Sequence, residues 1–384
     1  MVGNVSEAQG SAAPGVPGRQ TPWDATARGH PEPGMAVAVS PGAERVARLR
    51  DEALACAPDE PHARPPRWTP EWREALLQGI AALLARSQLP GAWVSALSVP
   101  RFVHAQSQGI CDLFGARVEG RPDGNFYVHP LSDEPSAVDD ARPGPLEQSV
   151  YWGAVRWVRY ARAATRSRFA FRNPVMCGPF DLANYLLGTT RLMEWVYTNP
   201  ATIHRLLEKT TAAVIGMVGA LREAAGGALN PHHFGCLANA FDLCSECRSL
   251  VSARMFEEFE APYLRRIGEA LGPYAIHSCG SWERTIPASL RDPNLKGMHG
   301  QVRENDLREL CRLAGGRVLL AIGPSACLDE RYTWPDRASF LAHVLETTPA
   351  WQALEVQISE SEVELYRRLS SVEVSGVAGQ LPLR

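Results

Sequence analysis

The sequence lacks the features that mark membrane, secreted and nucleotide-binding proteins. Its longest apolar runs, such as residues 211–221, are interrupted by glycine or bounded by charge, well short of the roughly 20 residues that span a bilayer. The N-terminus has no basic segment followed by an apolar stretch, which argues against a secretory signal. No glycine-rich dinucleotide fingerprint or phosphate-binding loop has the usual spacing, so no nucleotide cofactor is implied.

The chain also lacks an excess of either charge and a high density of cysteine. Its formal net charge is -3, and the basic and acidic residues are interleaved, so no basic stripe is available to bind a phosphate backbone. Nine cysteines are too few for a secreted disulfide scaffold, and an odd number cannot pair fully within one chain. We therefore expect a cytoplasmic protein with reduced thiols and with neither nucleic acid nor membrane as a partner.

What remains is an ordinary globular composition, with 45% hydrophobic and 21% charged residues in 384. Residues 1–45 are rich in glycine, proline, alanine and serine, which predicts a disordered leader, and translation can start at Met1 or at Met35. We expect N-terminal helices in residues 46–90, one α/β domain in 91–375 and a tail in 376–384.

Short apolar runs alternate with amphipathic stretches, a pattern typical of a parallel sheet with helical crossovers. The predicted strands are residues 92–98, 169–176, 233–238, 274–278, 295–299, 317–322 and 354–359, with 125–130 as a short strand of an insertion. The predicted helices are residues 43–57, 70–86 after an N-cap at Thr69, 182–198, 200–225, 253–271, 305–313 and 334–347. This repetition predicts a (β/α)8 TIM barrel, although the eighth strand is not evident from the sequence.

Polar residues at the ends of these strands are the candidates for the site, because barrel enzymes collect their catalytic groups there. His277 and Cys279 are two apart on one strand, so both side chains lie on the same face and can converge on one ion, with ligand atoms suited to zinc. The alternative, which is the commoner outcome for an isolated pair, is a satisfied core histidine beside a small apolar cysteine.

Other candidates carry more ambiguous signals. Cys244 and Cys247 have a spacing that suits metal binding or redox exchange, but buried packing is the default expectation for both, and Cys177 is ambiguous in the same way. His232 and His233 lie at the start of the predicted strand 233–238 and not after its end, which would place them at the end of the barrel that serves stability, so neither is expected to act in catalysis.

Asp181 and Asp242 are candidates for acid/base catalysis or cation binding, and helix capping explains either equally well. The candidates for binding a substrate are residues near strand ends. They are Arg101, Arg172 and Arg248, which can clamp a carboxylate or support other residues, together with Asn239 and Gln301.

Four segments together resemble the uroporphyrinogen decarboxylase superfamily, which includes zinc-dependent, corrinoid-linked methyltransferases. They are CGPFDLA at 177–183 followed by Gly188, TNPATIH at 198–204, LVSARMFEEF at 250–259 followed by Pro262 and Tyr263, and IHSCG at 276–280. The resemblance extends over about residues 90–370. It implies a (β/α)8 barrel, and in its methyltransferase branch the His-x-Cys pair holds zinc, which lowers the pKa of a bound thiol.

The chain departs from both branches of that superfamily. The methyltransferase branch carries a Pro-Gly-Cys turn near the last strand, where this chain has QISESE at 357–362, and Cys327, His299 or Glu360 could replace the missing thiolate. The arginine-rich N-terminal signature of the decarboxylase branch has no counterpart at 93–108, where Arg101 is the only arginine.

Three functions follow as hypotheses. The first is zinc-assisted methyl transfer to a thiol or other small acceptor, with a corrinoid or similar donor and a corrinoid protein as a partner. The second is decarboxylation of a carboxylated tetrapyrrole or other ring substrate without a metal. The third is a non-catalytic protein that binds a corrinoid or tetrapyrrole.

Overall fold

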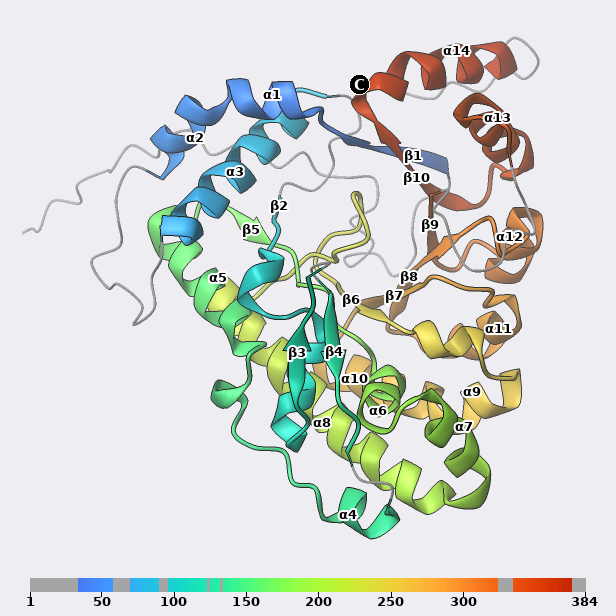
Figure 1. Ribbon diagram of the computed structural model, residues 1–384. Helices are drawn as coiled ribbons and strands as arrows, with labels where there is room; N and C mark the ends of the chain where they lie inside the picture. The colour runs from blue at the N-terminus through green and yellow to red at the C-terminus, as the bar shows by residue number, and fades with distance from the viewer. Residues whose placement is uncertain are drawn as a thin grey trace, which may run out of the picture.

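The fold is built around a six-stranded parallel sheet with the strand order β1-β10-β9-β8-β7-β6 (Figure 1). The structure is a computed structural model that describes residues 34–57, 70–89, 96–122, 125–131, 134–323 and 334–374. The six strands are β1 (Gly34–Ser40), β6 (Phe241–Cys244), β7 (Tyr274–Ser278), β8 (Leu295–Gln301), β9 (Leu319–Gly323) and β10 (Ala353–Ser359). A parallel α/β arrangement is therefore confirmed.

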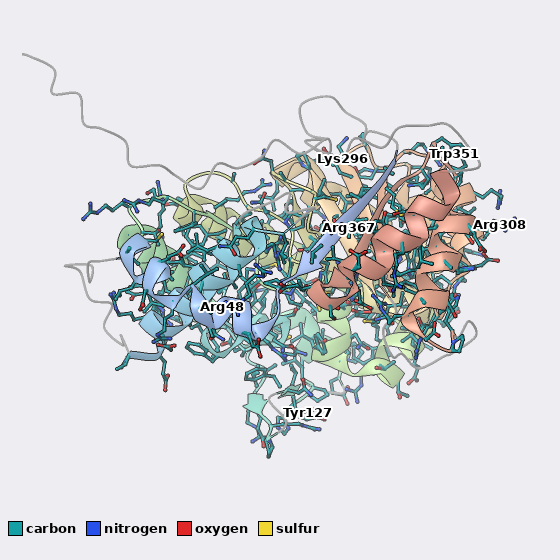
Figure 2. The ribbon with its side chains drawn as sticks, turned by 90° about the horizontal axis from the view of Figure 1, so that it is seen from above. Arg48, Tyr127, Lys296, Arg308, Trp351 and Arg367 are labelled. Atoms are coloured by element: carbon teal, nitrogen blue, oxygen red, sulfur yellow. The ribbon has the colours of Figure 1, made fainter. Side chains whose placement is uncertain are left out.

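Two short strands continue this order on the β6 side. β2 (Ala96–Leu97) pairs in parallel with β5 (Ala170–Phe171), and the segment after β5 meets β6 through an isolated parallel bridge between Cys177 and Cys244. The insertion predicted at 125–130 forms the antiparallel hairpin of β3 (Val118–Gly120) and β4 (Phe126–Val128), which projects from the body at the labelled Tyr127 (Figure 2).

β1 overturns part of the predicted leader. Residues 34–40 pair in unbroken parallel register with β10, from Gly34 opposite Ala353 to Ser40 opposite Ser359, and Ala36 and Val39 are buried. The strand was not predicted because it lies within the glycine-, proline- and alanine-rich N-terminal segment and its partner lies more than 300 residues away. Residues 1–33, Thr69 and the predicted tail lie outside the described residues.

Helices cover the outside of the sheet, and none of the described ones is long and apolar enough to cross a membrane (Figure 1). They are α1 (Ala43–Arg48), α2 (Arg50–Cys56), α3 (Pro70–Ser87), α4 (Pro135–Asp140), α5 (Trp152–Ala164), α6 (Pro179–Leu187), α7 (Thr189–Thr198), α8 (Pro200–Ala225), α9 (Ala253–Phe259), α10 (Ala261–Leu271), α11 (Ile286–Ser289), α12 (Leu307–Ala314), α13 (Arg337–Thr347) and α14 (Val363–Val374). Three predicted helices are each divided in two, at Leu49, Gly188 and Glu260. Gly188 has a φ of 80°, which ends α6 and redirects the chain into α7.

The predicted strand at 233–238 is wrong. Residues 231–240, hereafter the plug segment, form no strand and instead pack on the inner face of the sheet, which we define as the face carrying Ala275, His277, Gly297 and His299. Phe234, 1% exposed, occupies the space left by small inward-facing residues. Those residues are Ala36, Ala275, Gly297, Ala321 and Ala353. The apolar pattern of the plug segment reflects this packing and not strand pairing.

Buried polar groups anchor the plug segment, because backbone groups removed from water need partners. Arg172, 4% exposed, donates to the carbonyl oxygens of Pro231 (2.7 Å) and Phe234. Glu355, fully buried on β10, accepts hydrogen bonds from the N–H groups of Gly235 (2.8 Å) and Cys236 (2.9 Å). Arg172 is thus engaged with the backbone and is not the carboxylate clamp that its position suggested.

Candidate metal centre

The centre of the site is His277, on β7 and 6% exposed. Its Nε2 atom lies 3.2 Å from the Sγ atom of Cys279 and 3.2 Å from the Oε1 atom of Glu246. The structure therefore brings together the two side chains that the His-x-Cys spacing places on one face. It adds a carboxylate that was not among the predicted ligands.

Glu246 reaches the site from η4 (Glu246–Ser249), the turn that follows β6. Its Oε2 atom accepts a hydrogen bond of 2.6 Å from the N–H of Cys279, which leaves Oε1 facing His277. Burial opposes ionisation of Glu246, but hydrogen bonding and attraction to His277, with contacts to Cys279, lower its pKa overall. The available signal was its position two residues after the end of β6, within the Cys244-to-Cys247 segment.

The separations of Nε2 of His277 from the other two ligand atoms are close to those in a zinc site, and all three atoms lie within 4.8 Å of one another. Bonds of about 2.0 to 2.3 Å from zinc to nitrogen, oxygen and sulfur place tetrahedral ligands about 3.3 to 3.6 Å apart, close to the two separations of 3.2 Å. A neutral imidazole, a thiolate and a carboxylate also balance the charge of a divalent ion, which favours binding at a buried position. The ligand types and these two separations are therefore compatible with zinc held by three protein ligands.

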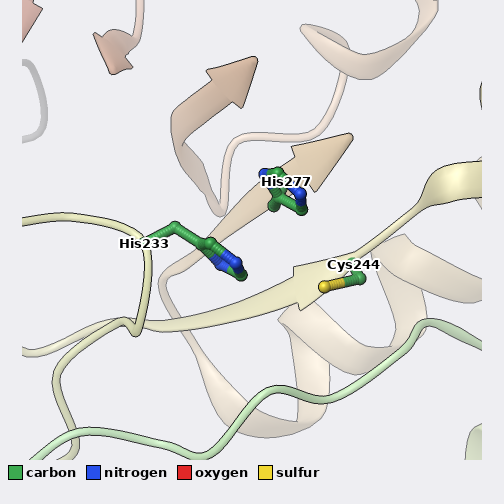
Figure 3. Close-up of side chains that lie close together, drawn as sticks. All are labelled: His233, Cys244 and His277. Atoms are coloured by element: carbon green, nitrogen blue, oxygen red, sulfur yellow. The ribbon is translucent and has the colours of Figure 1, made fainter. Parts of the chain in front are cut away.

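Two further histidines flank His277. The His233 ring stacks on the His277 ring with centroids 4.1 Å apart and planes 9° apart, and Cys244 lies beside both (Figure 3). The Nδ1 atom of His299 is 2.6 Å from Nδ1 of His277, on the side of the ring away from Cys279. Burial lowers the pKa values of His277 and His299, with neighbouring imidazoles adding to the effect.

The position of His233 corrects the expectation that it lies at the far end of the barrel. The plug segment packs on the inner face and places the His233 ring beside the ring of His277. The incorrect prediction of a strand at 233–238 had placed His233 at the opposite end of the sheet. Asp242, 1% exposed, accepts a hydrogen bond of 2.6 Å from Nδ1 of His233 and bonds from the N–H groups of His232 (2.7 Å) and His233 (2.9 Å). Burial would raise the pKa of Asp242, but His233 and His232 hold it below its usual value.

Asp181, the other predicted acid/base candidate, supports the turn that carries Glu246. It is 3% exposed and accepts hydrogen bonds from the N–H groups of Glu246 (2.7 Å) and Cys247 (2.9 Å). Burial, followed by the charges of Glu260 and Glu246, raises the pKa of Asp181. Its described contacts are therefore those of an anchor for η4.

Of the predicted substrate-binding residues, Gln301 alone lies at the same end of the sheet as His277 and Cys279. It ends β8 on the face that carries His299, is 6% exposed, and its Oε1 atom has no hydrogen-bond partner in the described part of the chain. Asn239 is an exposed turn residue with a φ of 54° that precedes β6, at the opposite end of that strand from Cys244. Arg101 is exposed in η1 (Arg101–Val103), and Arg248 is buried against Thr285 and Ser289.

The remaining predicted ligands fall elsewhere. Glu360 accepts hydrogen bonds from the N–H of Gly42 (2.7 Å) and from Nε of Arg45 (2.6 Å), so it joins the last strand to α1 and is not brought to His277. Cys327 lies outside the described residues. Cys244 and Cys247 are both buried, in keeping with the packing expected of them.

The protein has a parallel α/β fold in which His277, Cys279 and Glu246 lie at or just after the ends of neighbouring strands. Comparison with known proteins identifies its family. The family model of uroporphyrinogen decarboxylase (URO-D) matches residues 112–318, more than half of the chain. The chain belongs to the URO-D family, as the sequence motifs indicated.

The individual relatives are more distant. The chain is 31% identical over 197 residues to a uroporphyrinogen decarboxylase of Anaeromyxobacter sp. (strain Fw109-5), covering 49% of this chain and 53% of the relative. It is 30% identical over 183 residues to that of Anaeromyxobacter dehalogenans (strain 2CP-C), covering 46% and 48%. The chain thus matches about half the length of these curated relatives.

A solved structure extends the likeness in fold. The structure of a methyltransferase from Methanosarcina mazei superposes with a TM-score of 0.56 at 16% identity, covering 90% of this chain and 94% of that chain. At this identity the likeness concerns the fold alone. Of the three proteins named here, the solved structure is of a methyltransferase and the two curated relatives are decarboxylases.

Proposed function

We propose that this protein is a zinc-dependent methyltransferase whose metal is held by Glu246, His277 and Cys279. The observation that carries the proposal is the 3.2 Å separation of Nε2 of His277 from both Sγ of Cys279 and Oε1 of Glu246. Glu246 takes the place of the thiolate that the Pro-Gly-Cys turn supplies in the methyltransferase branch of the superfamily. We also infer that the strands close into an eight-stranded barrel, in which β1 and β6 are the strands that the sequence did not reveal.

Three protein ligands are typical of catalytic zinc, since the fourth position remains for water or substrate. Zinc bound here lowers the pKa of a thiol substrate, so that a nucleophilic thiolate exists at neutral pH. The acceptor is accordingly a thiol or another small molecule that binds metals, and the methyl donor is a corrinoid or a similar compound, presented by a corrinoid protein or free.

The protein residues prepare His277 and Cys279 for this role. The 2.6 Å contact between the Nδ1 atoms of His277 and His299 requires one donor and one acceptor, and we assign the proton to His277. The Nε2 lone pair of His277 is then directed toward Cys279 and Glu246, and His299 serves as a neutral acceptor. This arrangement follows the general pattern in which a partner of the second ring nitrogen orients a metal-binding histidine.

Gln301 is the residue best placed to contact the acceptor substrate. His277 lies opposite His299 in the register of β7 and β8, so Cys279 follows on the same side as Gln301, two residues further along each strand. The Oε1 atom of Gln301 is buried without a partner among the described residues. A substrate N–H or O–H that bonds to this oxygen would relieve the cost of leaving it unpaired.

Metal analysis and a transfer assay test the proposal together. Protein reconstituted with zinc should hold one ion per chain, and a His277→Ala, Cys279→Ser double variant should hold none. The parent should also remove the methyl group from methylcobalamin when a thiol acceptor is added, detected as loss of the methyl–cobalt absorbance. A reconstituted parent that binds no zinc would contradict the proposal.

Decarboxylation is the second candidate, favoured by the names and the 31% and 30% identities of the curated relatives. It needs cationic groups for the substrate carboxylates, and the buried Arg172 and Arg248 already bond to the protein. Release of carbon dioxide from a carboxylated tetrapyrrole after exhaustive chelation would favour it. Binding of a corrinoid or tetrapyrrole with no turnover would indicate the third candidate, a carrier.

A further inference from the structure

The stacked pair of His233 and His277 is the feature of the site that the ligand set does not explain. The ligand atoms of His233, Cys244 and His277 lie within 4.8 Å of one another, which suggests a second set of metal ligands (Figure 3). The orientation of the rings argues against it. An imidazole nitrogen directs its lone pair in the plane of its ring, and these planes are 9° from parallel with centroids 4.1 Å apart. One ion cannot lie in both planes.

The stack is held from the side of His233. Asp242 bonds to Nδ1 of His233 and to two backbone N–H groups, so the carboxylate fixes both the ring and the chain that carries it. The carbonyl oxygen of His233 accepts a hydrogen bond of 2.8 Å from Nε2 of Gln357. Phe234, the next residue, is buried and packs against the small side chains of the inner face. His233 therefore has little freedom to leave the face of His277.

We propose that His233, held by Asp242, is a positioning residue that keeps the His277 ring in the orientation required for metal binding. This inference rests on the proposed metal site. The ring of His233 blocks rotation of His277 away from Cys279 and Glu246, while His299 holds its other nitrogen. The buried negative charge of Asp242 behind the stack also favours the positive charge that a metal places on His277.

Cobalt binding to the whole chain tests this role apart from catalysis. The variants are His233→Ala, which removes the ring, His233→Phe, which keeps a stacking ring without nitrogen, and Cys244→Ser, the matched control for the alternative ligand set. Affinity is measured by competition with a chromophoric chelator, and the thiolate-to-cobalt absorption reports whether Cys279 remains a ligand. Thermal unfolding of each metal-free variant shows that it is folded.

We expect His233→Ala to bind cobalt about 10- to 100-fold more weakly, the range for residues that orient a ligand. His233→Phe should recover most of the affinity, and Cys244→Ser should match the parent in affinity and spectrum. Equal weakening by Phe and Ala, or loss on Cys244→Ser, would show direct ligation and overturn the inference. Parental affinity in His233→Ala would overturn it while leaving the proposed function intact, whereas a parent that binds no cobalt would overturn both.

Discussion

Gly297 gives a test of the plug segment in which the sign of the effect is decisive. Replacing a strand glycine with alanine ordinarily stabilises a protein by about 0.5 to 1 kcal/mol, because the unfolded chain loses freedom. At Gly297 the added methyl carbon would lie 2.7 Å from Cε1 and 2.9 Å from Cζ of Phe234, and 3.2 Å from Cβ of Ala275. Phe234 is 1% exposed and cannot move aside. Overpacking of this kind costs about 1 to 3 kcal/mol, so after the gain of about 0.5 to 1 kcal/mol Gly297→Ala should be destabilising overall, by up to about 2.5 kcal/mol.

The assay is urea unfolding followed by both circular dichroism and tryptophan fluorescence. Gly323→Ala is the matched control, because Gly323 ends the neighbouring strand β9 and a methyl group added there would meet no atom of the described residues within 4 Å. It should be neutral or stabilising. Adding Phe234→Leu to Gly297→Ala should cost less than the sum of the two single changes, by about 0.5 to 2 kcal/mol, since the shorter side chain makes room for the methyl. If Gly297→Ala stabilised the protein as the control does, Phe234 would not occupy the inner face.

Three further changes test the site and its supports. Glu246→Gln removes one negative charge from the ligand set and should weaken zinc binding at least about tenfold. The cobalt–thiolate absorption of Cys279 should remain. An unchanged zinc affinity would exclude Glu246 as a ligand. Asp181→Ala leaves the buried N–H groups of Glu246 and Cys247 without their acceptor. It should lower the free energy of unfolding by about 1 to 3 kcal/mol and also weaken zinc binding. Stability equal to that of the parent would show that water replaces the carboxylate. His104 is 1% exposed, and burial lowers its pKa from 6.5 to about 4, so the unfolded chain takes up this proton first as the pH falls. Stability is then lost from pH 6.5 down to about 4, by up to about 1.4 kcal/mol per pH unit. His104→Phe should gain stability relative to the parent between pH 7 and pH 5, and a constant difference would refute this assignment.

The parts of the fold that were evident from the sequence are those with a local cause. β7 has the predicted bounds because 274–278 is a short apolar run between turn residues, and α8 does because proline begins it and glycine follows it. His277 and Cys279 share a face for the equally local reason that side chains alternate along a strand. The four family motifs carried the assignment to the URO-D family.

What the sequence did not reveal depends on contacts between distant segments. β1 is a strand because β10 lies beside it, and the plug segment is apolar because Ala36, Ala275 and Gly297 leave space for Phe234. Glu246 faces His277 because Asp181, 65 residues earlier, binds the backbone of its turn. His233 was misplaced for the same reason, since its position follows from the packing of the plug segment.

The zinc ligands themselves are the most direct test of the central claim. X-ray absorption at the zinc edge of the reconstituted protein, without substrate, counts the sulfur atoms bound to the metal. Ligation by Glu246, His277 and Cys279 predicts one sulfur at about 2.3 Å and the remaining nitrogen and oxygen ligands at about 2.0 to 2.2 Å. Two or more sulfur ligands per zinc, or no sulfur at all, would contradict the account.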